Sequence, residues 1–198
     1  MKFILASSSP RRQDLLRRLQ TPFDVILPEV DELTIVSAGN PETYCTALAE
    51  LKANDISQHY PGELVIGADT IVVLGDEIFG KPNDKAAAEH MLQTLSGKTH
   101  QVYTGVCLKC TEKNIQHQFA EITTVTFRNL DDRDIAHYIE SCPPYDKAGA
   151  YGIQDWSAVF VKEIRGCYDN VVGFPISRFY QELKKLGINL LYTISEPS

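Results

Sequence analysis

Residues 65–74 read VIGADTIVVL and form most of an apolar run from Leu64 to Leu74. The run is rich in β-branched residues and has the length of one long buried strand. Gly75-Asp76 follows as a hairpin-turn signal, so the sequence predicts a returning strand over Glu77–Phe79. The sequence therefore predicts a β-hairpin over residues 64–79.

An acid lies inside this apolar strand, in the tetrapeptide Gly67-Ala68-Asp69-Thr70. A buried ionised carboxylate is costly unless it is paired or bound to a metal. Asp69 is therefore a candidate metal ligand or general base. The competing interpretation is a local cap or bulge that turns the acid to solvent, which the strong apolar flanks disfavour.

Strands and helices mix along the rest of the chain, which predicts the α/β class with a mixed sheet. No linker separates independent domains, so we expect one domain over residues 1–198. The expected strands are 2–6, 23–27, 100–110, 115–127 and 158–164, beside the hairpin. The expected helices are 10–19, 41–57, 85–95, 131–141 and 171–186, and a loop is expected over 142–154. Asp84 is the expected N-cap of the third helix, and Gly187 is expected to end the last one.

The composition narrows the function classes. The 198 residues carry a net charge of −7, which argues against nucleic acid as the main partner but not against a free nucleotide. Five scattered cysteines suit a reducing compartment better than a disulfide framework. No signal peptide and no membrane-length apolar stretch stand out, so we expect a cytoplasmic protein without a membrane partner.

A second candidate site is the stretch Ser7-Ser8-Ser9-Pro10-Arg11-Arg12, where a strand ends and a helix begins. Ser9 is a good N-cap, and Pro10 fits the first helical position. Backbone N–H groups at a helix start attract anions, and arginine forks match phosphate oxygens. Ser7, Arg11 and Arg12 are thus candidate phosphate ligands. A plain cap with two solvated arginines remains the alternative.

Isolated charges beside turns are weaker signals. Considered one at a time, the lysines beside turns are best interpreted as solvated surface charges; they are Lys52, Lys81 and Lys147. Glu32 lies in an acidic loop and is either a Mg²⁺ ligand or a solvated acid. The stretch DKAGAYGIQ at 146–154 combines small residues, which allow close backbone approach, with Gln154, whose amide can read a base edge. Here too a tight structural loop is the alternative.

Taken together and in this order, these stretches resemble the Maf family of nucleotide pyrophosphatases. The resemblance runs from the first strand to the last helix. The stretches are ILASSSPRR (4–12), VDE (30–32), LAELKA (48–53), GADTIV (67–72), GKP (80–82), LSGKTHQVYTGV (95–106), DKAGAYGIQ (146–154) and NVVGFP (170–175).

The resemblance implies a fold related to inosine triphosphate pyrophosphatases, with a mixed twisted sheet flanked by helices and a cleft between two lobes. It implies hydrolysis of a nucleoside triphosphate to monophosphate and pyrophosphate with a divalent cation, Mg²⁺ or Mn²⁺. The family often forms dimers, so a homodimer is expected. The form of the 146–154 loop resembles the subgroup that acts on dTTP and UTP.

Residue roles also follow from the resemblance. Asp69 falls on the family's proton acceptor, and Arg11, Thr70 and Gln154 fall on positions linked to substrate choice. We expect Glu32 and Asp69 to share the cation, with the triphosphate held by Ser7, Arg12, Lys52, Lys81 and Lys147. Two alternatives stay open: the same chemistry on another or modified nucleotide, and a nucleotide-binding regulator of cell division.

Overall fold

The computed structural model describes residues 1–36 and 39–190. Within these residues, seven strands form one sheet in the order β2-β1-β3-β5-β6-β7, with β4 also paired to β3. Strand β1 is parallel to β2 and β3, and the other pairs are antiparallel, so the expected mixed sheet is confirmed. The strands are β1 (Phe3–Ala6), β2 (Phe23–Val25), β3 (Leu64–Leu74), β4 (Glu77–Phe79), β5 (Thr99–Cys110), β6 (Ile115–Phe127) and β7 (Val161–Arg165).

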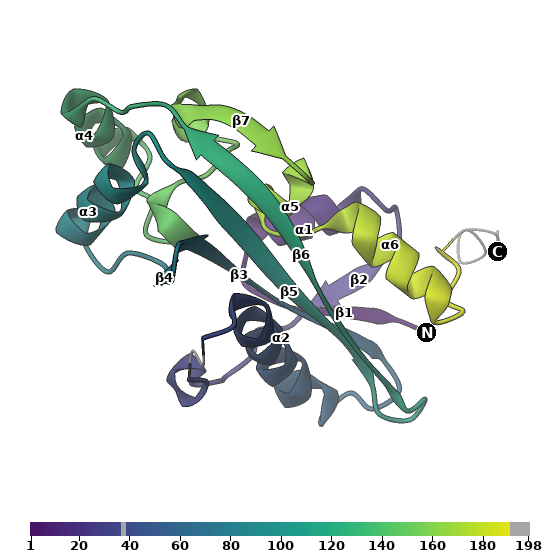
Figure 1. Ribbon diagram of the computed structural model, residues 1–198. Coiled ribbons are helices and arrows are strands. Elements are labelled where there is room, and N and C mark those ends of the chain that lie inside the picture. The colour runs from purple at the N-terminus through teal and green to yellow at the C-terminus, as the bar shows by residue number, and fades with distance from the viewer. Residues whose placement is uncertain (37–38, 191–198) are drawn as a thin grey trace.

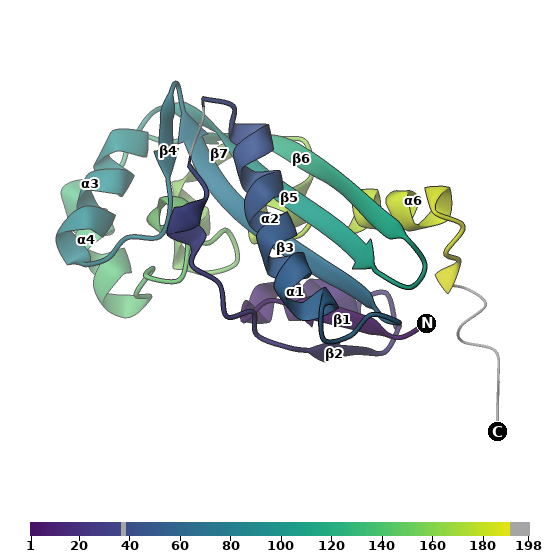
Figure 2. The same cartoon turned by 90° about the horizontal axis from the view of Figure 1, so that it is seen from below.

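Helices cover both faces of this sheet (Figure 1). Helix α2 lies across one face, as the view from below shows (Figure 2), while α1 and α6 pack on the other. Helices α3 and α4 gather at one end of the sheet. The helices are α1 (Pro10–Arg17), α2 (Pro41–Ser57), α3 (Lys85–Leu95), α4 (Asp132–Ser141), α5 (Tyr168–Val172) and α6 (Ile176–Lys185), with 3-10 turns at Glu32–Thr34, Ala148–Ala150 and Trp156–Phe160.

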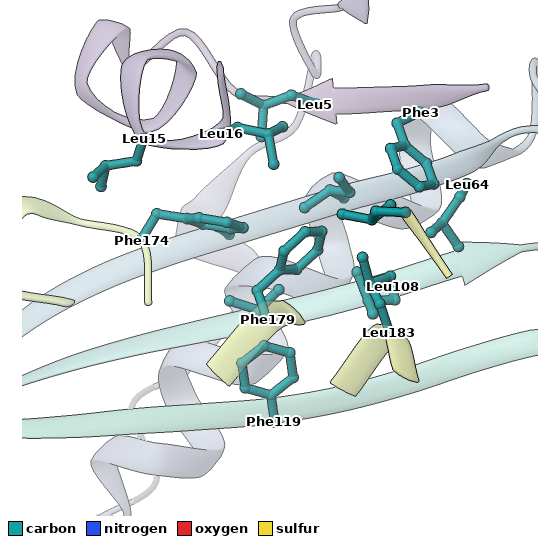
Figure 3. Packing of buried hydrophobic residues seen from close by; sticks show 14 of the residues in the cluster. Phe3, Leu5, Leu15, Leu16, Leu64, Leu108, Phe119, Phe174, Phe179 and Leu183 are labelled. Carbon is teal, nitrogen blue, oxygen red and sulfur yellow. The ribbon is translucent and has the colours of Figure 1, made fainter. Parts of the chain in front are cut away.

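The apolar core on the α1 and α6 face falls into two clusters. In the first, α1 and α6 pack against β1 and the early part of β3, with Leu15, Leu16 and Phe179 among its side chains (Figure 3). In the second, α3 and α4 pack against the later part of β3 through residues such as Leu92 and Val72. These two clusters are the cores of the two expected lobes.

Helix α2 contacts the sheet through small residues. A Cβ placed on Gly67 would lie 2.1 Å from the carbonyl oxygen of Ala49, and one on Gly105 would lie 2.4 Å from that of Cys45. The helix backbone therefore lies directly on the backbones of β3 and β5. A helix can approach a sheet this closely only where side chains on both surfaces are small or absent.

This close approach also determines which face of α2 is buried. The spacing of Tyr44, Leu48 and Leu51 in the sequence predicts one apolar face. Leu48 is buried, but Tyr44 and Leu51 are only half-buried. The buried stripe is rotated toward Cys45, Ala49 and neighbouring positions, because small residues fit against the strand glycines better than large ones.

Two other expectations were wrong at their edges. The helix expected over 171–186 is split into α5 and α6, because Gly173 has φ 125° and Pro175 follows it. The strand expected from residue 158 begins only at Val161, because Asp155 caps a 3-10 turn over Trp156–Phe160. Elsewhere the expected elements match the structure within about two residues.

Candidate functional site

The sheet has a gap beside β3. Strand β1 pairs with β3 as far as Gly67, and β4 pairs with it from Val72 onward. Between these pairings, residues 68–71 have a strand neighbour on the β5 side only, within the part of the chain that the structure describes. Helix α1 leaves β1 over one face of the sheet and α2 enters β3 over the other, and such a switch point commonly opens a ligand crevice at the strand ends.

Asp69 and Thr70 lie in the part of β3 that borders this gap, and their side chains point to opposite faces of the sheet. Successive residues of a strand point to opposite faces, so Asp69 points toward α2 and Thr70 toward α1. Their contacts agree with this, because Asp69 pairs with Lys52 of α2, whereas Thr70 accepts a hydrogen bond from Arg12 of α1. Asp69 and Thr70 are therefore adjacent in sequence but contact different helices on opposite faces of the sheet.

A pocket of about 850 Å³, including space open to solvent, lies on the Thr70 face. It separates the two apolar clusters, with the start of α1 on one side and the 146–154 loop on the other, so the expected cleft between lobes is present. Val72, Val102 and Tyr151 give it an apolar wall. Its lining includes seven of the predicted site residues: Ser7, Arg11, Arg12, Thr70, Lys81, Lys147 and Gln154.

Arg12 is fixed at the start of α1 by three acceptors. Its Nε donates to the Gly173 carbonyl at 2.9 Å, Nη1 to Ser7 Oγ at 3.2 Å and Nη2 to Thr70 Oγ1 at 3.0 Å. Ser9 caps the same helix by accepting from the Arg12 backbone N–H. Burial lowers the pKa of Arg12 although the carboxylates of Asp69 and Glu32 act in the opposite direction. A guanidinium remains charged in such surroundings, so Arg12 presents a positioned cation.

Arg11 and Lys147, which both line the pocket, are joined by one carboxylate. Arg11 Nη1 lies 2.6 Å from Asp146 Oδ2, and Lys147 Nζ lies 2.9 Å from Asp146 Oδ1. Burial opposes ionisation of Asp146, but hydrogen bonds from both cations outweigh it and lower its pKa to about 2. This carboxylate ties the start of α1 to the 146–154 loop.

On the opposite face, one lysine holds two carboxylates. Lys52 Nζ lies 2.5 Å from Asp69 Oδ1 and 3.0 Å from Glu32 Oε1, and its side chain is 9% exposed. Asp31 caps the 3-10 turn that carries Glu32 to this position. The buried acid that the sequence placed in β3 is therefore paired, as its burial requires.

Electrostatic effects reach across the gap. Partial burial opposes ionisation of Glu32, but the positive charge of Lys52 outweighs it and lowers the pKa of Glu32, with further contributions from Lys81 and Arg12. Lys81 and Arg12 line the pocket on the Thr70 face. The carboxylates on one face and the cations on the other thus belong to one electrostatic site.

The structure divides the ten predicted residues between these two faces. Glu32, Lys52 and Asp69 lie outside the pocket lining and form their own cluster. Lys81 is exposed and has no ion-pair partner among residues 1–36 and 39–190, which leaves its ammonium accessible to an anion.

Sequence reasoning missed several residues that shape the site. Asp146 and Gly173 lie within the quoted stretches DKAGAYGIQ and NVVGFP, but nothing in their spacing indicated their contacts with the two arginines. Thr104, fully buried in β5, bonds the Thr70 hydroxyl at 2.9 Å. A buried threonine in a strand is common, so composition gave no signal for it.

Two carboxylates at one point fit a hard divalent cation. Mg²⁺ is usually held by one or two carboxylates together with substrate phosphates and waters. No group of three or more His, Cys, Asp or Glu side chains that could hold a metal ion gathers in the described part of the chain. Glu32 and Asp69 thus have the donor type that an open site for such a cation needs.

The chain matches known proteins over nearly its whole length. The family model described as Maf-like protein matches residues 2–186. The dTTP/UTP pyrophosphatase of Carboxydothermus hydrogenoformans is 46% identical over 187 residues, which cover 94% of this chain and 100% of the relative. That of Bacillus cytotoxicus is 50% identical over 184 residues, covering 93% and 95%.

A solved structure supports the fold. The HAM1 protein from Coxiella burnetii superposes with a TM-score of 0.51 at 12% identity, over 93% of this chain and 99% of that one. At this identity the likeness concerns the arrangement of helices and strands alone.

Among the residues that the structure describes, no helix is long and apolar enough to span a bilayer.

Proposed function

We propose a function for this chain from one established fact: it belongs to the Maf-like protein family. We propose that it hydrolyses the nucleoside triphosphates dTTP and UTP to the monophosphate and pyrophosphate. The names of relatives that are 46% and 50% identical over more than nine-tenths of the chain support this substrate class. The alternatives are other or modified nucleotides and a regulatory role without turnover.

The observation that carries the proposal is the gap beside β3. It brings a carboxylate pair on one face next to a cation-lined pocket on the other. Phosphoryl chemistry depends mainly on positioning and on neutralising charge, so acids and cations must meet at the reacting phosphorus. We place the nucleoside in the pocket and the α-phosphate in the gap, within reach of Asp69.

In this arrangement Asp69 accepts the proton of the attacking water. Arg12, fixed by Ser7, Thr70 and Gly173, holds phosphate oxygens, and the N–H groups at the start of α1 add donors. Arg11, Lys81 and Lys147 offset the charge of the triphosphate. Lys52 acts mainly on the two carboxylates, because its ammonium is already bound by both.

Substrate choice is assigned to the pocket. Gln154 is exposed at the end of the 146–154 loop, and its amide can both donate to and accept from a uracil or thymine edge. Thr70 and Arg11 line the same pocket and complete the set. Apolar side chains such as Val102 and Tyr151 lie in the same pocket and suit the face of a base.

We propose that Glu32 and Asp69 hold a divalent cation, Mg²⁺ or Mn²⁺. When bound, such a cation neutralises phosphate charge and polarises the bond that breaks. Lys52 holds the two carboxylates together, and its positive charge outweighs the effect of burial and lowers the pKa of Glu32.

The test is pyrophosphate release from a panel of triphosphates with Mg²⁺, with Mn²⁺ and with a chelator. Fast, cation-dependent release from dTTP and UTP is the expected result. Release from other nucleotides alone keeps the chemistry and discards the assignment of Gln154. No release from any member of the panel, with binding retained, moves the function to a regulator.

We also propose that residues 1–198 form a single domain, that the protein is cytoplasmic and that it assembles as a homodimer. Residues 37–38 and 191–198 of this domain lie outside the described residues. Light scattering during gel filtration measures the mass of the assembly, and a monomer would contradict the homodimer.

A further inference from the structure

The turn that carries Gln154 is closed by one buried serine. Ser157 is fully buried, and its Oγ accepts from the Gly152 N–H at 3.0 Å and lies 2.8 Å from the Gly152 carbonyl oxygen. The Asp155 N–H also donates to the Gly152 carbonyl, at 3.0 Å. Gln154 is therefore displayed on a tight turn whose two ends are joined through Gly152.

Asp155 completes this turn with its side chain. Its Oδ1 accepts from the Ser157 N–H at 3.1 Å and from Ser157 Oγ at 2.8 Å. Its Oδ2 lies 3.6 Å from Lys147 Nζ and accepts from the Tyr138 hydroxyl at 3.4 Å. One carboxylate thus joins the turn around Gln154, the pocket cation Lys147 and helix α4.

The path of Lys147 depends on the same turn. A Cβ on Gly152 would lie 2.8 Å from both Cδ and Cε of Lys147 and 2.8 Å from Asp155 Oδ2. The lysine stem therefore crosses directly over Gly152 to reach the carboxylates. Any larger residue at position 152 would displace the stem, the carboxylate or both.

Gln154 itself has no side-chain anchor. None of the described residues donates to or accepts from its amide, and the residue is exposed in the pocket. The backbone sets the position from which such a side chain starts and therefore the region that its amide can reach. The closure of the turn fixes that starting point for Gln154.

We propose that Asp155 and Ser157 are positioning residues for substrate choice, which aim the Gln154 amide and hold Lys147 at the pocket. This inference rests on the proposed function and adds two residues to it that touch no substrate. Such residues act on recognition through geometry, because a displacement of about 1 Å is enough to weaken a directed hydrogen bond.

The first experiment compares Asp155→Ala with Asp155→Asn. Asparagine keeps the Oδ1 acceptor for Ser157 but loses the charge facing Lys147, whereas alanine loses both. We expect Asp155→Ala to reduce the preference in kcat/KM for UTP over CTP about tenfold, mainly through KM, as loss of one hydrogen bond would. Asp155→Asn should keep the UTP-to-CTP ratio while lowering kcat/KM for both substrates together.

The second experiment is a double-substitution cycle with Gln154→Ala. If Asp155 acts through Gln154, Asp155→Ala should change the UTP-to-CTP ratio in the unsubstituted chain and leave it unchanged in the Gln154→Ala background. Ser157→Ala should behave in the same way and serves as the test if Asp155→Ala fails to fold. Equal effects in both backgrounds, or an unchanged ratio in the single variants, overturn the inference.

Asp131→Ala is the matched control, because Asp131 caps α4 by the same type of bond, accepting from the Arg133 N–H at 2.7 Å, and does not line the pocket. It should lower the melting temperature without changing the UTP-to-CTP ratio. If it changes the ratio as much as Asp155→Ala does, general destabilisation accounts for the effect and the inference is overturned. Absence of pyrophosphate release by the unsubstituted chain is a separate result that overturns the proposed function and this inference with it.

Discussion

The Nζ atom of Lys52 lies 2.5 Å from Oδ1 of Asp69, and the side chains are 9% and 13% exposed. Helix α2 brings the lysine to this point because its backbone rests directly on Gly67, two residues before Asp69 in β3. The position of the buried charge pair is therefore set by the absence of a side chain on a neighbouring residue.

Asp69→Asn should remove most of the turnover while leaving the fold intact. The amide oxygen can still accept from Lys52, but an amide cannot take a proton from water. A general base typically contributes about 10²–10⁴-fold, so kcat should fall by that order. Steady-state kinetics and thermal unfolding of the same preparation check both parts. Near-normal kcat in a folded variant would exclude Asp69 as the base.

Lys52→Met should destabilise the protein at neutral pH. The change keeps most of the buried stem but leaves Asp69 and Glu32 facing each other without a cation. Loss of a partner for a buried polar group costs about 1–3 kcal/mol, and the exposure of Glu32 places the expected loss in the lower part of that range. Urea unfolding measures this free energy.

Lys81→Met is the control for this change, because it removes an exposed charge of the same site with no ion-pair partner among the described residues. It should affect KM for the triphosphate rather than stability. Equal unfolding free energies for the two variants would contradict the role assigned to Lys52.

Gly67→Ala tests the close approach of α2. The added methyl would lie 2.1 Å from the Ala49 carbonyl oxygen, so the helix must shift away from β3. Overpacking of this kind costs about 1–3 kcal/mol. The shift also separates Lys52 from Asp69, so kcat should fall as well. Gly80→Ala is the control, since nothing lies within 4 Å of a Cβ there, and comparable losses in both variants would refute the packing argument.

Stability should fall in acid through Glu182 of α6. Burial opposes its ionisation, but hydrogen bonds from Lys185, Arg178 and His117 outweigh this and lower its pKa from 4.5 to about 2. A carboxylate with a depressed pKa in the folded state stabilises the fold above its unfolded pKa. That contribution is lost as the pH falls from about 4.5 toward 2.

Glu182→Gln should therefore be less stable than the unsubstituted chain at pH 7 and should lose less stability on acidification. Urea unfolding between pH 7 and pH 2 measures the slope. Glu163→Gln removes a carboxylate from an exposed pair with Arg165 and should leave the slope almost unchanged. A slope for Glu182→Gln equal to that of the unsubstituted chain would contradict the prediction.

Local features of the sequence were enough to predict most elements. Ser9 and Pro10 begin α1, Asp84 caps α3 and Gly187 follows α6, as their conformational preferences require. Each of these signals depends on a few adjacent residues. The family resemblance, carried by contiguous stretches such as DKAGAYGIQ, is likewise a property of the sequence and agrees with the match to the Maf-like model.

The sequence by itself thus determined the element order, the family and the residue types at the site. Only the tertiary structure decided how those residues are divided, with Asp69 facing α2 and Thr70 facing the pocket. The gap beside them exists because β1 ends at Ala6, opposite Gly67, and β4 reaches only as far as Phe79, opposite Val72. The tertiary structure also decided that Lys52 binds two carboxylates. These facts depend on register between segments distant in the chain and on close backbone packing, whereas local propensity acts only over a few neighbouring residues.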